Sequence, residues 1–354
     1  MSAQASAADA QAPFDLQVLE HFLAARIDGF KGPVEVSRFK GGQSNPTYLL
    51  STPGRQYVMR SKPAPVAQLL PSAHAVEREF RLQSALAGSA VPVAKMHCLC
   101  EDESVIGRAF YVMDFVEGRI FWEQTLPGMD PAERTAIYDE LNRVIAELHG
   151  IDFAALGLSD YGKAGNYFSR QIDRWTRQYQ ASETVGIDAM DRLIAWLPEH
   201  IPQEAYPQVS LVHGDYRIDN VIFHPTEPRI LAVIDWELST LGHPLADFAY
   251  HLMSWHITPG GAMRGLAGQD LEALGIPQES AYIRAYERRI GRPVAGDWNF
   301  YLAYNLFRIA AILQGIAKRV EEGTASSAQA AEYGLQARPL AELGWTFAQK
   351  VERA

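Results

Sequence analysis

The sequence is poor in cysteine and has no surplus of positive charge. Cys98 and Cys100 are its only cysteines, and their i, i+2 spacing in an apolar stretch predicts two side chains on one face of a strand. No further cysteine could complete a metal or redox site, so we expect two buried structural thiols in a reducing compartment, the cytoplasm. A net charge of −10 argues against a sequence-independent nucleic-acid binder, and we expect no nucleic-acid partner.

Long hydrophobic runs and targeting signals are also missing. No run approaches the roughly 18 apolar residues that a membrane span needs, so we expect no membrane partner. Residues 1–13 are rich in Ala, Ser and Gln and have neither the basic start nor the apolar core of a signal peptide, which predicts a disordered tail. The 354 residues, 47% of them hydrophobic, are enough for a large core and for two lobes.

The pattern of apolar residues changes near residue 118. Before it, a helix at 14–27 and a second at 74–87 accompany short alternating runs that predict strands at 34–39, 47–51, 56–60, 91–100 and 110–115. After it, long helical patterns dominate, beginning with the capping sequence Asp130-Pro-Ala-Glu133. We predict an α+β fold with a small-sheet lobe at 14–113, a hinge at 114–118 and a larger, mainly helical lobe at 119–354.

Three oxygen-bearing side chains stand at the spacing of a kinase catalytic loop and its metal-binding strand. Asp215 follows an apolar run, Asn220 lies five residues later, and Asp235 ends the next apolar run. Phosphoryl transfer passes through a loose transition state whose charge requires metal ions and oriented donors. A carboxylate beside the acceptor hydroxyl can take its proton, and amide and carboxylate oxygens suit Mg²⁺. We therefore predict Asp215 as the base and Asn220 and Asp235 as magnesium ligands.

Two neighbouring residues are expected to support this loop. His213 directly follows the apolar run, which favours a buried histidine that fixes the loop rather than a catalytic group. Asp247 lies shortly after Asp235, and we expect it to anchor the loop through backbone N–H groups. Asp219, inside the loop, is expected to be solvated.

A glycine pair between two predicted strands is expected to contact the triphosphate. Gly41 and Gly42 let backbone N–H groups approach phosphate oxygens, and Ser44 and Asn45 add side-chain donors. A Gly-Gly pair alone is typical of a hairpin turn, and its order before Asp215 is what favours the nucleotide role.

The third predicted strand offers a cation for the nucleotide phosphates. We prefer Arg60 to Lys62, because a guanidinium can clamp a phosphate through two donors. Its carboxylate partner is expected to be Glu79 rather than Glu77, since Glu79 lies beside the apolar Phe80. In the segment that joins the lobes, the backbone at Asp114 and Val116 is expected to hydrogen-bond the adenine edge.

The acceptor is expected to lie against the helical lobe. Candidate contacts are Trp236, Trp255, Tyr301, Tyr304, Asn305 and Arg308, although most of these aromatic residues fit a core equally well. An acceptor of the CoA type would favour basic residues such as Arg264, Arg308, Lys318 and Arg319, because its phosphates need cationic partners. An aminoglycoside acceptor would favour an acidic cleft.

The loop motifs resemble those of the aminoglycoside phosphotransferase and choline kinase superfamily. His213-Gly-Asp215 with Asn220, then Ile234-Asp235-Trp-Glu237 and Gly242-His-Pro-Leu-Ala-Asp247, match that pattern in order and spacing. The resemblance spans roughly residues 30–320. It implies a protein-kinase-like two-lobed fold, ATP or GTP as the donor, Mg²⁺, and the roles given above to Asp215, Asn220 and Asp235.

A closer resemblance is to the kinase-like domain found fused to acyl-CoA dehydrogenases. It is carried by Tyr57-Val-Met-Arg60 with Lys62-Pro63, by His74-Ala-Val-Glu-Arg-Glu79 and by residues 307–316. The subgroup implies hydroxyacyl-CoA thioesters as acceptors, phosphorylated on the acyl hydroxyl. Within these 354 residues we expect no flavin-binding, acyl-CoA-oxidising domain. The sequence departs from the wider superfamily at Arg60, where Lys is common, and at His243, where an acidic residue is common.

The leading hypothesis is therefore an ATP- and Mg²⁺-dependent small-molecule kinase, and two alternatives stay open. One is a catalytically inactive nucleotide-binding regulatory module of the same fold, which the Arg60 departure permits. The other is a metal-dependent phosphohydrolase that uses Asp215, Asp219 and Asp235 around two metals. That alternative leaves Asn220 and the glycine pair without a role.

Overall fold

The chain divides into two compact units. The computed structural model describes residues 14–39, 45–63, 75–163, 165–202, 208–260, 263–294, 297–324 and 330–351, so the predicted tail at 1–13 lies outside the described residues. The first unit takes the chain up to Ile120 together with Ala154–Leu158 and Asp219–Leu238, and the second takes the remainder. The break at Ile120 lies two residues after the predicted hinge. Ala154–Leu158 and Asp219–Leu238, which we predicted as part of the lobe at 119–354, group instead with the first unit.

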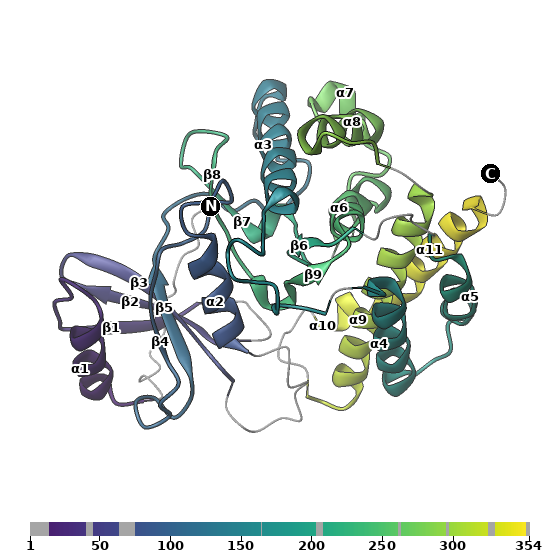
Figure 1. Cartoon of the computed structure of the whole chain (residues 1–354). Coiled ribbons are helices and arrows are strands. Elements are labelled where there is room, and N and C mark those ends of the chain that lie inside the picture. The colour runs from purple at the N-terminus through teal and green to yellow at the C-terminus, as the bar shows by residue number, and fades with distance from the viewer. Residues whose placement is uncertain are drawn as a thin grey trace. The chain divides into compact units, whose positions relative to one another are not determined.

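The first unit is built on a five-stranded sheet whose neighbouring strands are all antiparallel (Figure 1). This small sheet confirms the predicted α+β class. The predicted strand at 91–100 begins only at Met96, and residues 92–95 before it are irregular. In the order in which they pair, the strands are β1 (Glu35–Arg38), β2 (Thr47–Thr52), β3 (Arg55–Ser61), β5 (Phe110–Asp114) and β4 (Met96–Cys100).

Alternation along the strands gives the sheet two apolar faces, one for each helix. Helix α1 (Leu16–Arg26) packs Leu19 and Leu23 on the face that carries Tyr57, Met59 and Val112. Helix α2 (Val76–Leu86) belongs with the opposite face, where Val76 and Phe80 meet Tyr111 and Met113. As the sequence predicted, the side chains of Cys98 and Cys100 are both buried on one face, which is the α1 face. Burial raises the pKa of both thiols, in keeping with a structural role.

A short hairpin completes the first unit. Its strands β7 (Val221–Phe223) and β8 (Ile230–Val233) are antiparallel. The Val233 amide donates to the Pro92 carbonyl at 2.8 Å, and Arg119 forms an isolated bridge with Phe223. A Cβ at Gly118 would lie 2.2 Å from the Phe223 carbonyl oxygen, so this approach requires glycine. The end of the predicted hinge is therefore held against β7.

The second unit is mainly helical and confirms the predicted change in pattern. The capping box forms as expected, because Asp130 accepts from the Glu133 amide at 2.9 Å and the Glu133 side chain accepts from the Asp130 amide. Strands β6 (Ser210–Val212) and β9 (Thr240–Gly242) pair antiparallel. The helices are α3 (Pro131–Gly150), α4 (Tyr167–Ser182), α5 (Asp188–Trp196), α6 (Pro244–Leu252), α7 (Leu271–Leu274), α8 (Glu279–Ile290), α9 (Trp298–Glu321), α10 (Ala330–Leu335) and α11 (Ala337–Val351).

Helix α9 is the central element of this unit. Helices α4, α6, α10 and α11 all pack against it. Within the described residues it is the one helix long and apolar enough to cross a membrane, and 83% of its most apolar window is buried inside the protein. That burial identifies α9 as a core helix.

The buried histidine of α6 gives a pH-dependent stability. His251 is 3% exposed, and burial lowers its pKa to about 4. The unfolded chain, with a histidine pKa of about 6.5, then binds a proton that the folded chain does not, so the free energy of unfolding falls as the pH drops from about 6.5 to 4. We expect a loss of about 3 kcal/mol over that window in urea titrations at several pH values. His251→Gln should flatten the slope, whereas replacing the exposed His21 should not. Equal slopes in all three proteins would contradict the assignment.

Candidate active site

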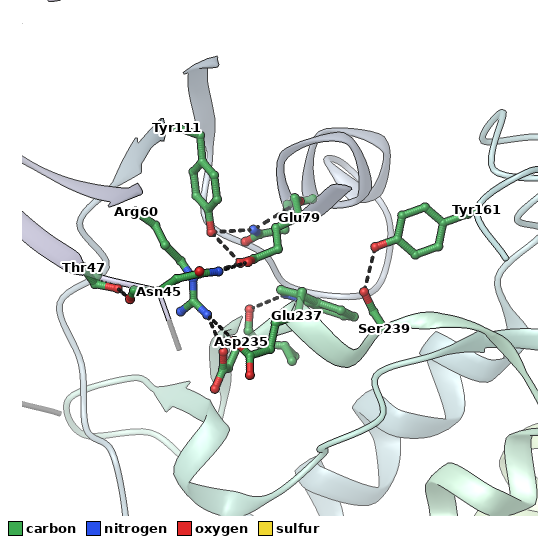
Figure 2. Close-up of polar contacts among 12 residues, drawn as sticks. Asn45, Thr47, Arg60, Glu79, Tyr111, Tyr161, Asp235, Glu237 and Ser239 are labelled. Atoms are coloured by element: carbon green, nitrogen blue, oxygen red, sulfur yellow. Dashed lines mark hydrogen bonds and ion pairs between the residues drawn. The ribbon is translucent and has the colours of Figure 1, made fainter. Parts of the chain in front are cut away.

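The guanidinium of Arg60 lies among three carboxylates within the first unit. Its Nε is 3.1 Å from Glu79 Oε2, and its Nη2 is 2.7 Å from Asp235 Oδ1 and 3.1 Å from Glu237 Oε2 (Figure 2). The predicted contact between Arg60 and Glu79 is therefore present. Asp235 joins it because the residues after β8 group with the sheet unit. Glu237 was not singled out by the sequence, although its place two residues after Asp235 was a signal for it.

The electrostatics of this cluster favour additional positive charge. Burial alone would lower the pKa of Arg60, but the carboxylates of Glu79, Asp235 and Glu237 raise it above its ordinary value. One permanent cation faces three carboxyl groups, so the cluster is negative when all three are ionised. Burial raises the pKa of Glu79, and Arg60 opposes that rise. A group of this charge is suited to draw in a metal ion together with an anionic ligand.

Two neutral donors also hold Glu79. The Tyr111 hydroxyl donates to Glu79 Oε2 and the Asn45 side-chain amide donates to Oε1, each at 3.0 Å. Asn45 is 2% exposed and its side-chain amide contacts Glu79, so its role as a phosphate donor stays a prediction. The other members of the predicted phosphate loop, Gly41, Gly42 and Ser44, lie outside the described residues.

The second charged pair of this region is separate from the cluster. Lys62 on the sheet side pairs with Glu77 at the start of α2, and both side chains are partly exposed. The choice of Arg60 and Glu79 over Lys62 and Glu77 therefore selects the more buried of two parallel pairs. Arg60 lies on β3 and Lys62 lies just beyond its end, while Glu77 and Glu79, two residues apart on α2, lie on different faces of that helix.

The β7–β8 hairpin brings Asn220 and Asp235 to the same end. Asn220 ends a short 3-10 helix directly before β7, and Asp235 follows β8 after a single residue. The Ile234 amide donates to the Asn220 carbonyl at 2.9 Å, which fixes the two segments side by side. Asp235 has a φ of +66°, in the left-handed region that non-glycine residues rarely adopt. Strained backbone of this kind clusters at functional sites.

Asn220 and Asp235 suit Mg²⁺, which takes few protein ligands, better than they suit a metal ion that is coordinated by protein side chains alone. Asn220 and Asp235 supply an amide and a carboxylate oxygen, and the neighbouring cluster has three carboxyl groups to one cation. Among the described residues no group of three or more His, Cys, Asp or Glu side chains could hold a metal ion. Mg²⁺ needs no such group, since it binds through one or two protein ligands plus phosphates and water.

The predicted adenine contacts lie at the end of β5. The Asp114 amide donates to the Lys95 carbonyl at 2.9 Å, so this N–H is already used within the sheet. Burial alone would raise the pKa of the Asp114 carboxyl, but hydrogen bonds from His97 and Arg55, each 2.6 Å, hold it below its ordinary value. For an adenine edge, the roles of the Asp114 carbonyl and of Val116 stay predictions.

In the second unit, the loop that carries Asp215 is held through its backbone. Asp247 accepts from the His213 amide at 2.7 Å and from the Gly214 amide at 2.8 Å, which is the contact that the sequence predicted. Gly214 has a φ of +84°, a conformation that favours glycine in the turn before Asp215. His213 is fully buried, and its Nδ1 accepts from the Asp215 amide at 3.1 Å. Its position fits the predicted structural role.

Asp247 is itself buried and needs compensation. Burial alone would raise its pKa, but His149 and the His213 amide hold the pKa below its ordinary value. His149 Nε2 lies 3.2 Å from Asp247 Oδ2, and its Nδ1 is 2.6 Å from the Tyr286 hydroxyl. Each polar group in the series from the loop amides through Asp247 and His149 to Tyr286 has a partner, which is what a buried hydrogen-bond network requires.

The Asp215 carboxylate has two contacts that the sequence did not single out. The Tyr250 hydroxyl donates to Oδ1 at 2.5 Å, and Arg217 Nε lies 3.9 Å from the same oxygen. Tyr250 could have been found from its spacing, because it lies three residues after Asp247 on α6 and therefore on the same helix face.

Most of the predicted acceptor contacts are packed into cores. Tyr301 and Tyr304 are fully buried, and Asn305 donates to the Ala246 carbonyl at 2.9 Å. Trp236 and Trp255 donate their indole N–H groups to backbone carbonyls, each at 2.9 Å. Arg308 is 5% exposed and donates to the Gly214 carbonyl. Burial favours a packing role for the four aromatic residues and Asn305. The hydrogen bond to Gly214 places the Arg308 side chain against the loop that carries Asp215.

Comparisons with known proteins agree with this reading of the chain. The sequence profile of the phosphotransferase enzyme family matches residues 35–294. The crystal structure of a candidate aminoglycoside phosphotransferase from Ralstonia eutropha JMP134 is 64% identical, with a TM-score of 0.87 over 95% of this chain and 99% of that one. A thermostable mutant of aminoglycoside phosphotransferase APH(4)-Ia, solved with AMP-PNP and hygromycin B, is 18% identical with a TM-score of 0.59 over 93% of this chain and 98% of that one, which shows a shared fold.

The curated relatives are longer proteins. Mouse acyl-CoA dehydrogenase family member 10 is 48% identical over 320 residues, which are 90% of this chain and 30% of that protein. Human acyl-CoA dehydrogenase family member 11 is 40% identical over 345 residues, which are 96% of this chain and 44% of that protein. The chain thus spans less than half the length of either relative, and the resemblance to a domain carried by such proteins is confirmed.

The Arg60 cluster predicts a large stability difference between two arginines of β3. Arg60→Met leaves buried carboxylates without their cation, and we expect it to lower the free energy of unfolding by about 3–5 kcal/mol. Arg55, whose side chain is 45% exposed, pairs with Asp114, and Arg55→Met should cost under about 1 kcal/mol. Urea denaturation of both variants measures the difference. Equal losses would mean that the Arg60 cluster does not support the fold.

Proposed function

The chain belongs to the phosphotransferase enzyme family, and on that premise we propose that it is an ATP- and Mg²⁺-dependent kinase that phosphorylates a hydroxyl of a small molecule. The observation that carries the proposal is the β7–β8 hairpin, which brings Asn220 and Asp235 together at one end, five residues along the chain from Asp215. ATP as the donor is supported by the structural relative that was solved with AMP-PNP.

The proposed reaction needs one base and one orienting clamp from this chain. The acceptor oxygen forms a bond to the γ-phosphorus while the bond from that phosphorus to the bridging oxygen of ADP breaks. The hydroxyl proton passes to the Asp215 carboxylate, which the amide contacts of its loop hold in place. Arg60, fixed by Glu79, is proposed to grip the nucleotide phosphates. Mg²⁺, held by Asn220 and Asp235, would supply the positive charge that the phosphates need.

For the acceptor, we propose a hydroxyacyl-CoA thioester rather than an aminoglycoside. The curated relatives at 40% and 48% identity are named for acyl-CoA chemistry. The 64% identical structure carries an aminoglycoside name only as a candidate, and APH(4)-Ia, solved with hygromycin B, shares only the fold at 18%. The surroundings of Asp215 also favour this class, because Arg217 lies in the same loop 3.9 Å from the carboxylate and Arg308 donates to the Gly214 carbonyl. Positive charge beside the base opposes a polycationic acceptor. Of the basic residues suggested for the CoA phosphates, Arg264 is about half exposed.

The alternatives have less support. A phosphohydrolase with two metals would need a cluster of acidic ligands, and the described residues contain no group that could hold a metal by itself. An inactive module would have no reason to keep the Asp215 carboxylate and its contacts to Tyr250 and Arg217. Both alternatives are tested by the same experiment.

That experiment combines purified protein, ATP, Mg²⁺ and three acceptors: 3-hydroxybutyryl-CoA, 4-hydroxybutyryl-CoA and hygromycin B. We expect mass spectrometry to detect a phosphorylated CoA thioester, formed only with ATP. Asp215→Asn should lower kcat by about 10²–10⁴-fold, the contribution of a general base, while nucleotide binding and the circular dichroism spectrum are retained. Transfer at the wild-type rate by this variant would overturn the assignment of the base. Phosphate release without any nucleotide requirement would favour the hydrolase.

The metal assignment is tested with Asp235→Asn. The variant keeps the shape of the side chain and tolerates a left-handed backbone, but it removes one negative charge. We expect the Mg²⁺ concentration for half-maximal activity to rise by about tenfold or more while the KM for the acceptor stays the same. Glu227→Gln, at an exposed carboxylate of the same hairpin, is the matched control. An unchanged Mg²⁺ requirement in Asp235→Asn would contradict the ligand role.

A further inference from the structure

Helix α6 contacts both the backbone and the side chain of the loop that carries Asp215. Asp247 accepts from the backbone amides of His213 and Gly214, at 2.7 and 2.8 Å. Three residues later on the same helix, Tyr250 donates its hydroxyl hydrogen bond to Asp215 Oδ1 at 2.5 Å. Residues three apart share a helix face, so one rigid helix fixes both the backbone and the carboxylate of the loop.

The Tyr250 ring is itself fixed by a cation. The guanidinium carbon of Arg308 lies 5.0 Å from the centroid of this ring, and Arg308 Nη2 donates to the Gly214 carbonyl. Arg308 comes from the buried helix α9, while Tyr250 is 3% exposed on α6. Two core helices thus hold the phenol against the loop from different directions. A hydroxyl supported in this way has little freedom to turn away from Asp215.

The direction of the hydrogen bond is set by protonation. Burial, and then the charge of Asp215, raise the pKa of Tyr250 well above its ordinary value. The phenol therefore stays protonated throughout any working pH range and acts as the donor. A hydrogen bond to the charged form of a carboxyl group favours that form. The charges of Arg308 from α9 and of Arg217 from the loop itself also act on the Asp215 carboxylate, and His213 Nδ1 accepts from the Asp215 amide.

We propose that Tyr250 is a positioning residue of the transfer reaction: its hydroxyl, braced by Arg308, fixes the plane of the Asp215 carboxylate so that the base meets the acceptor hydroxyl in one orientation. The inference rests on the proposed function only in taking Asp215 as the base. It adds a residue from outside the loop motif to the machinery of the reaction. A phenylalanine would fill the same space in α6 but could not hold the carboxylate.

The first test does not depend on turnover. The 13Cγ signals of aspartates labelled at the carboxyl carbon are followed by NMR across pH in the wild type and in Tyr250→Phe, and Asp215→Asn identifies the signal of Asp215. We expect the midpoint of the Asp215 titration to rise by about one pH unit in Tyr250→Phe, because the hydrogen bond to the ionised form is lost. An unchanged midpoint would overturn the proposal even if no acceptor were ever found.

The second test uses the kinase reaction with hydroxybutyryl-CoA. Tyr250→Phe should lower kcat by about tenfold or more while the KM for ATP changes little, and the acidic limb of the pH profile should move in the same direction as the NMR midpoint. Tyr138→Phe is the matched control, since it removes another buried hydroxyl, one that donates to the Gln124 carbonyl at 2.6 Å. Its kinetics and pH profile should match the wild type.

The outcomes separate positioning from a merely structural role. A loss of Tm in Tyr250→Phe with kcat and pH profile unchanged would mean that the hydroxyl serves stability alone, and this would overturn the proposal. Failure of Tyr250→Phe to fold, with Tyr138→Phe folded, would count against it in the same way. If wild-type protein transfers phosphate to none of the acceptors but the NMR midpoint still shifts, the proposed function fails while the contact between Tyr250 and Asp215 stands.

Discussion

The buried carboxylate of Asp247 is the constraint on which the loop depends. A charge in the interior is costly unless it is paired and hydrogen-bonded, and this one receives two backbone amides and a histidine. Those same amides would otherwise be orphaned in the turn around Gly214. The partners thus satisfy each other, and Asp215 inherits a fixed backbone. Since α6 packs against α9, the precision of the loop derives from the core of its unit.

The Arg60 cluster also compensates a buried charge, but here the buried charge is positive. Here a cation is buried, and the carboxylates of Glu79, Asp235 and Glu237 make that burial tolerable. Glu79 belongs to α2 and Asp235 to the end of β8, so a single guanidinium joins three elements that are distant in sequence. Such pairing contributes little net stability compared with apolar packing, but breaking it is expensive. A cluster that adds little net stability yet is costly to break fits the phosphate role that we propose for Arg60.

Local sequence patterns predicted those features that depend on interactions between residues close in the sequence. Strand alternation and helix spacing located the sheet, α1, α2 and the Asp130 cap. The donors of a guanidinium favoured Arg60, the apolar neighbour Phe80 favoured Glu79, and the position of Asp247 shortly after Asp235 favoured its contact with the loop. What the sequence did not predict depends on packing between distant segments. Nothing in the sequence near Asn45 shows that its side chain contacts Glu79, and no pattern at Asp219–Leu238 shows that this hairpin belongs to the same unit as the five-stranded sheet. Tyr250 was missed because an aromatic residue in an apolar helix is usually core.

The left-handed backbone at Asp235 has an evolutionary consequence. Holding a side chain at that φ is a cost that glycine would avoid, so the chain gives up some stability to aim a carboxylate. A descendant that abandoned catalysis would gain by drifting to glycine there, whereas a working enzyme is kept from that mutation. The residue found at position 235 would therefore distinguish active kinases from inactive ones among the descendants of this chain.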